Sequence, residues 1–224
     1  MDTSILIGRL LCSRLCHDLL NPISAVGTGL ELMAEGPEPG ALELVRTSAG
    51  ALAARLDGYR FAFGALGGGR SDEQPFATAR RLAETLFALG KVRLQWDAAA
   101  DGASAPTDIA RLTLNMALLG REALARGGTL SVQIQPIEGG LGLAIIAQGP
   151  RAALRDDCAA ALVADVDPRS LTPQTVQAYL TASLAREAGA EFEVSTTPGG
   201  DPLPQFRLAA FVPLATRVAA ATSI

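Results

Sequence analysis

Apolar residues in the first third of the chain recur at alternating steps of three and four, the spacing of amphipathic helices. One such stripe, within residues 4–34, consists of Cys12, Leu15, Leu19, Ile23, Val26, Leu30 and Met33. A second stripe, within residues 42–63, consists of Leu42, Val45, Ala49, Leu52, Leu56, Tyr59 and Phe63. The segment Glu35–Gly40 between them is rich in Gly and Pro, which do not continue a helix. The pattern therefore predicts an antiparallel helical hairpin.

A lone hairpin of this length cannot bury both apolar stripes against its own helices. A second copy packed across a two-fold axis would cover them and complete a four-helix bundle. We therefore expect the chain to form a homodimer through the hairpin.

The pattern changes after a glycine-rich segment at residues 67–75, which we interpret as a linker. Beyond it, helical and alternating segments are mixed, and Thr107 is the expected N-cap of one helix. The expected helices are 76–89, 107–126, 151–163 and 172–188, and the expected strands are 92–96, 129–137, 141–147, 191–196 and 205–212, with turns at Gly139-Gly140 and Gly199-Gly200. This order predicts an α+β fold, a sandwich of a mixed sheet with helices on one face.

The expected organisation is a helical hairpin at 1–66, the linker at 67–75, an α/β domain at 76–215 and a tail at 216–224. Apolar residues make up 49% of the chain but aromatic residues only 4%, so Ala, Leu and Val must build the core. The net charge of -4, without a block of Lys or Arg, argues against nucleic acid or an anionic membrane as partner.

Three features of the composition point to the cytoplasm. The N-terminus lacks the basic segment of a secretory signal, and no apolar run reaches the roughly 18 residues that span a bilayer. The three cysteines, an odd number, suit a reducing compartment.

His17 is the only histidine of the chain. At about 100° per residue it lies roughly 200° from Leu15 and 160° from Leu19, so it points away from the apolar stripe. We expect an exposed imidazole on a surface that a partner protein can cover. The candidate partner contacts on this surface are Leu10, Ser13, Arg14, Leu20 and Ser24.

A neutral imidazole is a nucleophile at physiological pH and can accept a phosphoryl group on a ring nitrogen. Asp18 is placed to orient or deprotonate the ring, and the amide of Asn21, one turn later, could position a phosphoryl oxygen or a water molecule. Arg14, one turn earlier, could lie beside the phosphoryl group. His17, Asp18 and Asn21 are the predicted catalytic residues.

Two plainer interpretations compete with this one. His17 could be a helical histidine without a role, although its outward position among small residues argues against that. Cys12, Cys16 and His17 could ligate a metal, but the two cysteines share a helical face that His17 does not, and no second cluster supplies further ligands. We expect no metal site and interpret both cysteines as small core residues.

The sequence His17-Asp18-x-x-Asn21-Pro22 resembles the phosphoacceptor motif of two-component histidine kinases, and the second domain is similar to their ATP-binding domain in its order of elements. The likeness is closer to the cytosolic histidine phosphotransferases of the alphaproteobacterial cell-cycle relay. It covers about residues 6–213. The shared features are Arg14-Leu15-Cys16-His17-Asp18, Ser24-Ala25, Gly29-Leu30, Phe61 to Gly64, Leu114-Asn115, Gly127-Gly128 and Gly149-Pro150-Arg151-Ala152.

Departures from the kinases imply that this domain is degenerate. Kinases hold Mg²⁺ with asparagines often spaced N-x-x-x-N, but here Leu118 and Leu119 follow Asn115. The adenine-reading loop Asp-x-Gly-x-Gly is replaced by Ala147-Gln148-Gly149-Pro150, and no glycine-rich lid follows, since the chain from Arg151 is expected to be helical. We therefore expect no nucleotide cofactor, a structural role for Asn115 and turns at the Gly pairs.

The resemblance implies a phosphorelay protein. His17 would take a phosphoryl group from the receiver domain of a hybrid kinase and pass it to the aspartate of a response regulator. The receiver would bring the Mg²⁺, and the second domain would add a docking platform. An ATP-dependent histidine kinase and a non-catalytic adaptor that only binds receivers are the alternatives.

Overall fold

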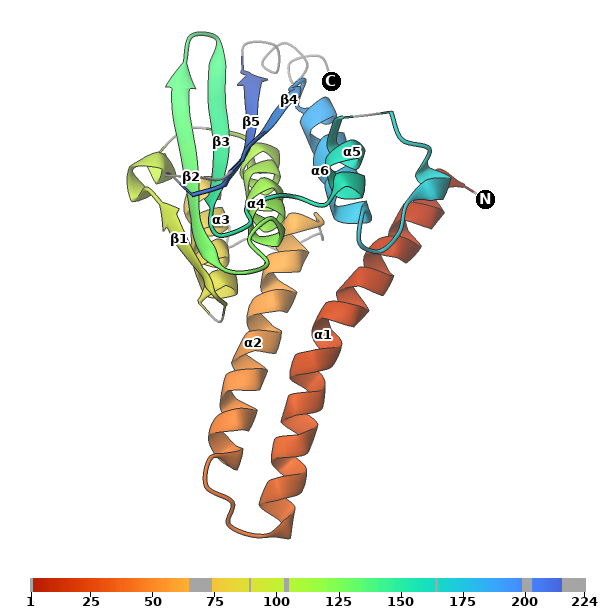
Figure 1. Cartoon of the computed structure of the whole chain (residues 1–224), viewed down its shortest axis with the longest axis vertical. Helices are drawn as coiled ribbons and strands as arrows, with labels where there is room; N and C mark the ends of the chain where they lie inside the picture. The colour runs from red at the N-terminus through yellow and green to blue at the C-terminus, as the bar shows by residue number, and fades with distance from the viewer. Residues whose placement is uncertain are drawn as a thin grey trace.

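A computed structural model describes residues 2–64, 74–88, 90–102, 105–163, 165–198 and 203–214. Figure 1 shows a long helical hairpin whose open end carries a domain of sheet and helices. Most of the expected linker (67–73), the tail 216–224 and the turn at Gly199-Gly200 lie outside the described residues.

The hairpin consists of α1 (Thr3–Glu35) and α2 (Ala41–Ala62), as the apolar periodicity predicts. The side chain of Asp2 caps the start of α1 by accepting a hydrogen bond from the Ser4 N–H at 2.9 Å. Gly40 begins α2 with a φ of 93°, a left-handed conformation that favours glycine. Both predicted helices and the turn between them are confirmed.

Small residues bring the two helices together. A Cβ added to Gly29 of α1 would lie only 2.6 Å from the Val45 side chain of α2, so a larger residue would push the helices apart. The large residues of the two stripes mostly face outwards. Eight of the twelve large apolar side chains exposed on the described part of the chain lie on the hairpin: Ile5, Leu20, Ile23, Leu30, Met33, Leu42, Leu44 and Leu56.

The second domain is a five-stranded mixed sheet in the order β1-β2-β3-β5-β4, with β1 and β2 parallel and the other pairs antiparallel. Its helices lie on one face of the sheet (Figure 1), which confirms the predicted α+β architecture. The elements are α3 (Pro75–Phe87), β1 (Val92–Trp96), η1 (Ala98–Gly102), α4 (Thr107–Glu122), β2 (Gly128–Ile137), β3 (Gly140–Gln148), α5 (Asp156–Val163), η2 (Pro168–Ser170), α6 (Val176–Glu187), β4 (Phe192–Thr197) and β5 (Gln205–Pro213).

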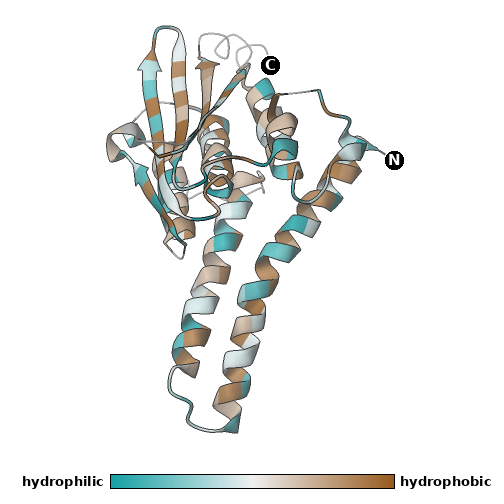
Figure 2. Ribbon diagram, viewed as in Figure 1, coloured by the Kyte–Doolittle hydropathy of each residue, from teal (hydrophilic) through white to brown (hydrophobic). Residues whose placement is uncertain are grey.

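One core joins the domain to the open end of the hairpin. Along β2 the side chains of Leu130 and Val132 are buried while Gln133 and Gln135 are exposed, the period-two pattern of a sheet covered on one face. α4 is buried along most of its length between the sheet and the other helices. Tyr59, Phe61 and Ala62 of α2 belong to the same core, and Ile7, Leu10 and Leu15 of α1 pack against it. Apolar segments alternate with polar ones along the strands and along both hairpin helices (Figure 2).

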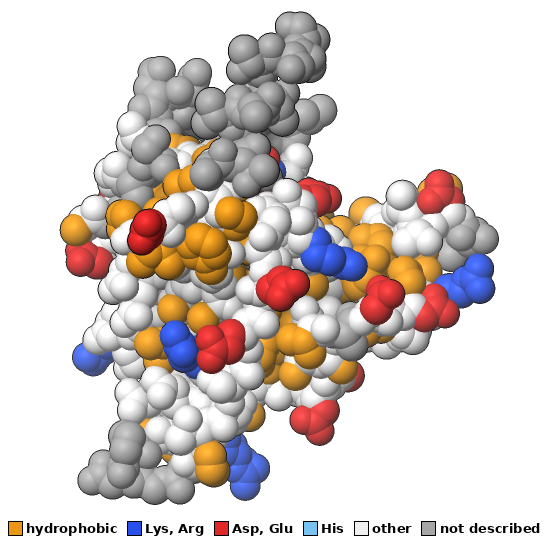
Figure 3. All heavy atoms as spheres, turned by 90° about the horizontal axis from the view of Figure 1, so that it is seen from above, with side chains coloured by type: hydrophobic (Ala, Val, Ile, Leu, Met, Phe, Trp, Pro, Cys, Tyr) orange, Lys and Arg blue, Asp and Glu red, His pale blue; other side chains and the backbone are white. Residues whose placement is uncertain are grey.

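Charged side chains of both signs are mixed, among uncharged ones, on the face of the second domain that lies farthest from the hairpin turn (Figure 3). Among the described helices, none combines the length and apolar character needed to cross a membrane.

The structure corrects four local predictions. The segment 151–155, expected to be helical, forms a turn at Arg151 and then no regular secondary structure, because Ala152 and Leu154 are buried in the core and the Ala153 N–H donates to the Ala123 carbonyl at 3.2 Å. α6 begins at Val176, after η2 and a turn at 173–175, and α4 ends at Glu122. Thr107 is the first helical residue rather than the N-cap, which is Pro106.

Asn115 joins three helices inside the core. It is fully buried, and its Nδ2 donates to the Ala62 carbonyl at the end of α2 at 2.8 Å and to the Arg111 carbonyl at 2.9 Å. Its Oδ1 accepts a hydrogen bond from Gln177 Nε2 of α6. With both its donor and its acceptor used inside the fold, Asn115 has a structural role.

We predict that Asn115→Ala lowers the free energy of unfolding by about 2 to 3 kcal/mol, because the buried Ala62 carbonyl and Gln177 amide lose a partner. Urea denaturation measures the change, with the exposed Gln135→Ala as the control variant. Equal stability of the two variants would contradict the structural role.

Candidate functional site

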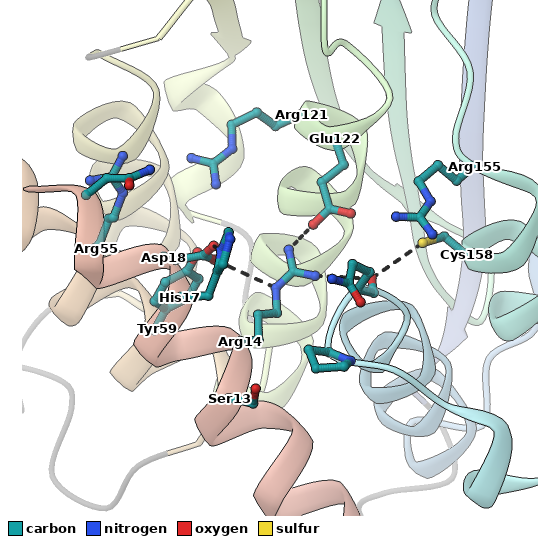
Figure 4. A pocket seen from close by; sticks show the side chains of 13 residues that line it. Ser13, Arg14, His17, Asp18, Arg55, Tyr59, Arg121, Glu122, Arg155 and Cys158 are labelled. Carbon is teal, nitrogen blue, oxygen red and sulfur yellow. Dashed lines mark hydrogen bonds and ion pairs between the residues drawn. The ribbon is translucent and has the colours of Figure 1, made fainter.

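His17 lies where the hairpin meets the second domain. Its side chain is 80% exposed, as the helical wheel predicts, although α1 itself packs against other helices. It forms part of the wall of a cavity of about 490 Å³ between α1, α2, α4 and the segment before α6 (Figure 4). Because the ring is open to solvent, a second macromolecule can reach it.

Asp18 is held between His17 and a tyrosine of the other hairpin helix. His17 Nδ1 lies 3.2 Å from Asp18 Oδ1, and the Tyr59 hydroxyl donates to Asp18 Oδ2 at 2.6 Å. Tyr59 is only 3% exposed, and its ring stacks on that of Phe63 with centroids 5.2 Å apart. The carboxylate is therefore fixed in place, and a proton on Nδ1 directed at it leaves the lone pair of Nε2 as the nucleophile.

Burial and the neighbouring Asp18 carboxylate raise the pKa of Tyr59 to about 12. Both effects disfavour the phenolate, the first by removing it from water and the second by repulsion and by the hydrogen bond that the neutral hydroxyl donates. Tyr59 is consequently a donor to Asp18 throughout the physiological pH range.

Arg14 connects the hairpin to the second domain. Its guanidinium forms an ion pair with Glu122 at the end of α4 and donates a hydrogen bond to the Gln174 carbonyl at 3.2 Å. Burial alone would lower the pKa of Arg14, but the attraction of Glu122 outweighs it and the pKa is raised. Burial raises the pKa of Glu122, against the attraction of Arg14. Arg14 Nε lies 3.9 Å from Asp18 Oδ2, so its charge also acts on that carboxylate.

The structure changes the picture for two of the predicted partner contacts. The side chain of Arg14 is only 14% exposed and engaged within the molecule, and Leu10 packs against the core of the second domain. Both therefore act mainly in joining the two domains. Ser13, Leu20 and Ser24 are exposed, so partner contact remains a prediction for them.

Asn21 and the two cysteines of α1 are exposed. Asn21 is exposed and lines the same cavity as His17, as expected from one helical turn, and its predicted catalytic role remains a prediction. Cys12 and Cys16, expected to be core residues, are exposed, because the face of α1 that they occupy is turned away from α2. Among the described residues, no group of three or more His, Cys, Asp or Glu side chains is placed to hold a metal ion.

Sequence reasoning missed the long-range partners of the site. Tyr59 was expected only as a seam position of α2, and Glu122 had no role, yet they hold Asp18 and Arg14. These pairs are 41 and 108 residues apart in the chain, so no local spacing reveals them.

Comparison with known proteins gives the family. Residues 76–200 match the family described as the histidine phosphotransferase C-terminal domain. The protein phosphotransferase ChpT of Brucella abortus (strain 2308) is 34% identical over 197 residues, which cover 85% of this chain and 90% of ChpT. The 1.7 Å structure of a bacterial phosphotransferase is similar with a TM-score of 0.75 and 30% identity, covering 91% of this chain and 95% of that one. The chain belongs to the histidine phosphotransferase family.

This membership confirms the predicted class of activity. The chain is a phosphorelay phosphotransferase that works through a histidine. His17 is the only histidine in its sequence.

The Tyr59–Asp18 contact predicts how the stability of the phosphotransferase depends on pH. The folded protein holds the Tyr59 proton more tightly than the unfolded chain, whose pKa is near 10.0. The protonated Tyr59 therefore contributes to the free energy of unfolding. This contribution is complete below pH 10 and is lost as the pH rises towards 12. Between pH 9 and 11 it should decline by about 1.3 kcal/mol. Urea denaturation of wild type and Tyr59→Phe measures it, with Tyr179→Phe as control. Equal pH dependence of wild type and Tyr59→Phe would contradict the contact.

Proposed function

We propose that His17 accepts a phosphoryl group from the aspartyl phosphate of a receiver domain and passes it to the aspartate of a response regulator in the cytoplasm. The observation that carries the proposal is the 80% exposed imidazole next to a fixed carboxylate, in a cavity open to a partner. Membership of the phosphotransferase family supports it.

In the proposed step, Nε2 of His17 attacks the phosphorus atom while the Nδ1 proton faces Asp18. The P–O bond to the receiver's aspartate breaks and its electron pair leaves on the carboxylate oxygen as the Nε2–P bond forms. Asp18, held by Tyr59, keeps the Nδ1 proton in place and offsets the positive charge of the phosphorylated ring. Transfer to the second aspartate reverses these changes. Asn21 would position a phosphoryl oxygen from the same helical face.

The phosphoryl group comes, in this proposal, from another protein and not from ATP bound to this chain. The packing of the second domain supports this. Asn115 is fully buried and its polar atoms are occupied within the fold, so it is not available to a Mg²⁺–nucleotide complex. A Cβ added to Gly149 would lie 2.5 Å from the Gly127 carbonyl oxygen, so these glycines pack backbone against backbone, which supports a role in packing rather than in binding phosphates. The Mg²⁺ that stabilises the transferring charge would come with the receiver.

The receiver would dock on the surface around His17. Leu20 is 57% exposed and Ser13 and Ser24 are also exposed, so α1 offers an apolar contact flanked by small polar ones. The second domain, fixed beside this surface by Arg14, would extend the docking platform.

The active form would be a homodimer. The outward stripe that includes Ile23, Leu30 and Met33 of α1 and Leu42 and Leu56 of α2 is exposed in the single chain. Burying apolar surface gains about 25 cal/mol per Å², so these residues favour pairing with a second hairpin. The result would be the four-helix bundle that the periodicity predicts.

Transfer from a radiolabelled phospho-receiver tests the proposed function. We expect label on the wild-type chain and none on His17→Ala, because the nucleophile is gone. Ser24→Ala, on the same face, should keep most of the transfer. Equal labelling of His17→Ala and wild type would refute the role of His17, and a chain that binds the receiver without taking label would be an adaptor.

Sedimentation at micromolar concentration tests the dimer. We expect the wild-type chain to have the mass of two copies and Leu30→Glu to shift towards one, because a charge would be buried in the bundle. Ile137→Glu, an exposed apolar position of the second domain, is the matched control. A monomeric wild type would contradict the proposal.

A further inference from the structure

The cavity beside His17 concentrates positive charge in an acidic chain. Its lining includes the four arginines Arg14, Arg55, Arg121 and Arg155, together with the carboxylates Asp18 and Glu122. The chain as a whole has a net charge of -4. Cationic side chains in a concave site attract an anion more strongly than the same charges spread over a surface.

Two of the four arginines are already paired with carboxylates. Arg14 forms its ion pair with Glu122, as described above. The guanidinium of Arg155 binds Asp157 through both Nε, at 3.1 Å, and Nη2. Arg14 is thus engaged inside the molecule, and Arg155 is paired at the surface.

Arg121 differs from Arg14 and Arg155 because its guanidinium contacts uncharged groups instead of a carboxylate. It stands in the last turn of α4, where Nη1 lies 3.4 Å from the Leu86 carbonyl and the guanidinium stacks 5.4 Å above the centre of the Phe87 ring. No carboxylate within the described ranges forms an ion pair with it. Figure 4 shows its guanidinium directed from α4 towards the cavity. Arg121 thus presents an oriented positive charge that forms no direct ion pair among the described residues, although the neighbouring Glu122 carboxylate attracts it.

Arg55 reaches the same cavity from the hairpin. It precedes Tyr59 by four residues on α2, so the two share one helical face, and both line the cavity. Arg55 makes no hydrogen bond or ion pair with another described residue. It is partly exposed and remains free to move towards an anion.

We propose that Arg55 and Arg121 form a binding site for the oxygens of the phosphoryl group as it moves to and from His17. The proposal rests on the proposed function and deepens it. The planar guanidinium fork matches the geometry of phosphate oxygens, and positive groups placed where charge develops stabilise the transition state of transfer. Because Arg121 belongs to α4, the second domain would take part in the chemistry as well as in docking.

A small phosphoryl donor tests this site apart from any receiver. With phosphoramidate, Nε2 of His17 attacks phosphorus, the P–N bond of the donor breaks, and ammonia leaves with the electron pair. No protein partner is needed, so the rate of phosphohistidine formation reports only on the chain's own residues. Phosphohistidine can be followed by ³¹P NMR on the full-length protein.

We expect Arg121→Gln and Arg55→Gln each to slow phosphohistidine formation about tenfold, in line with the loss of one group that stabilises transferring charge. Arg121→Lys, which keeps the charge without the fork, should fall between Arg121→Gln and wild type. Arg60→Gln is the matched control, since Arg60 is on α2 but outside the cavity lining. Thermal melts should show all variants folded.

The outcomes separate the two proposals. Wild-type rates for both Gln variants with phosphoramidate would overturn the phosphoryl site, even if transfer from a receiver were slowed, because the arginines would then bind the receiver's acidic surface. Slow rates with phosphoramidate support the site. If wild type also fails to take label from a phospho-receiver, the relay fails while the anion site stands.

Discussion

The ion pair between Arg14 and Glu122 is the interaction on which the site depends. Arg14 stands one helical turn before His17, and through Glu122 and the Gln174 carbonyl it holds α1 against the end of α4 and the segment before α6. Removing either charge would leave the other buried without its partner, which costs several kcal/mol. The ion pair therefore helps to hold the second domain beside the phosphoacceptor, together with the core that the hairpin and this domain share.

The residues that hold the site in place are different from the residue that a partner can reach. Tyr59, which is buried, and Glu122, which is partly buried, set the positions of Asp18 and Arg14. The imidazole of His17, in contrast, is exposed to solvent. In the second domain, the polar atoms of Asn115 are used to join helices, and the glycine turns pack on one another.

Local pattern was enough to predict the elements but not their contacts. The periodicity of α1 and the alternation of β1 predicted the correct elements, although the large residues of the α1 stripe lie mostly at the surface of the single chain. The segment 151–155 was assigned to a helix from its alanines, whereas it has no regular secondary structure and buries Ala152 and Leu154 in the core. The exposure of His17 followed from the helical wheel. Its supporting residues did not, because each comes from an element distant in the chain.

The central claim is that His17 takes its phosphoryl group from another protein. Incubation of the full-length chain with γ-labelled ATP and Mg²⁺, with and without a hybrid kinase that carries a receiver domain, tests it most directly. We predict label on the chain only when the kinase and its receiver are present, and loss of that label when the receiver's phosphorylated aspartate is replaced. Label that appears with ATP alone, at a rate independent of the kinase, would contradict the account.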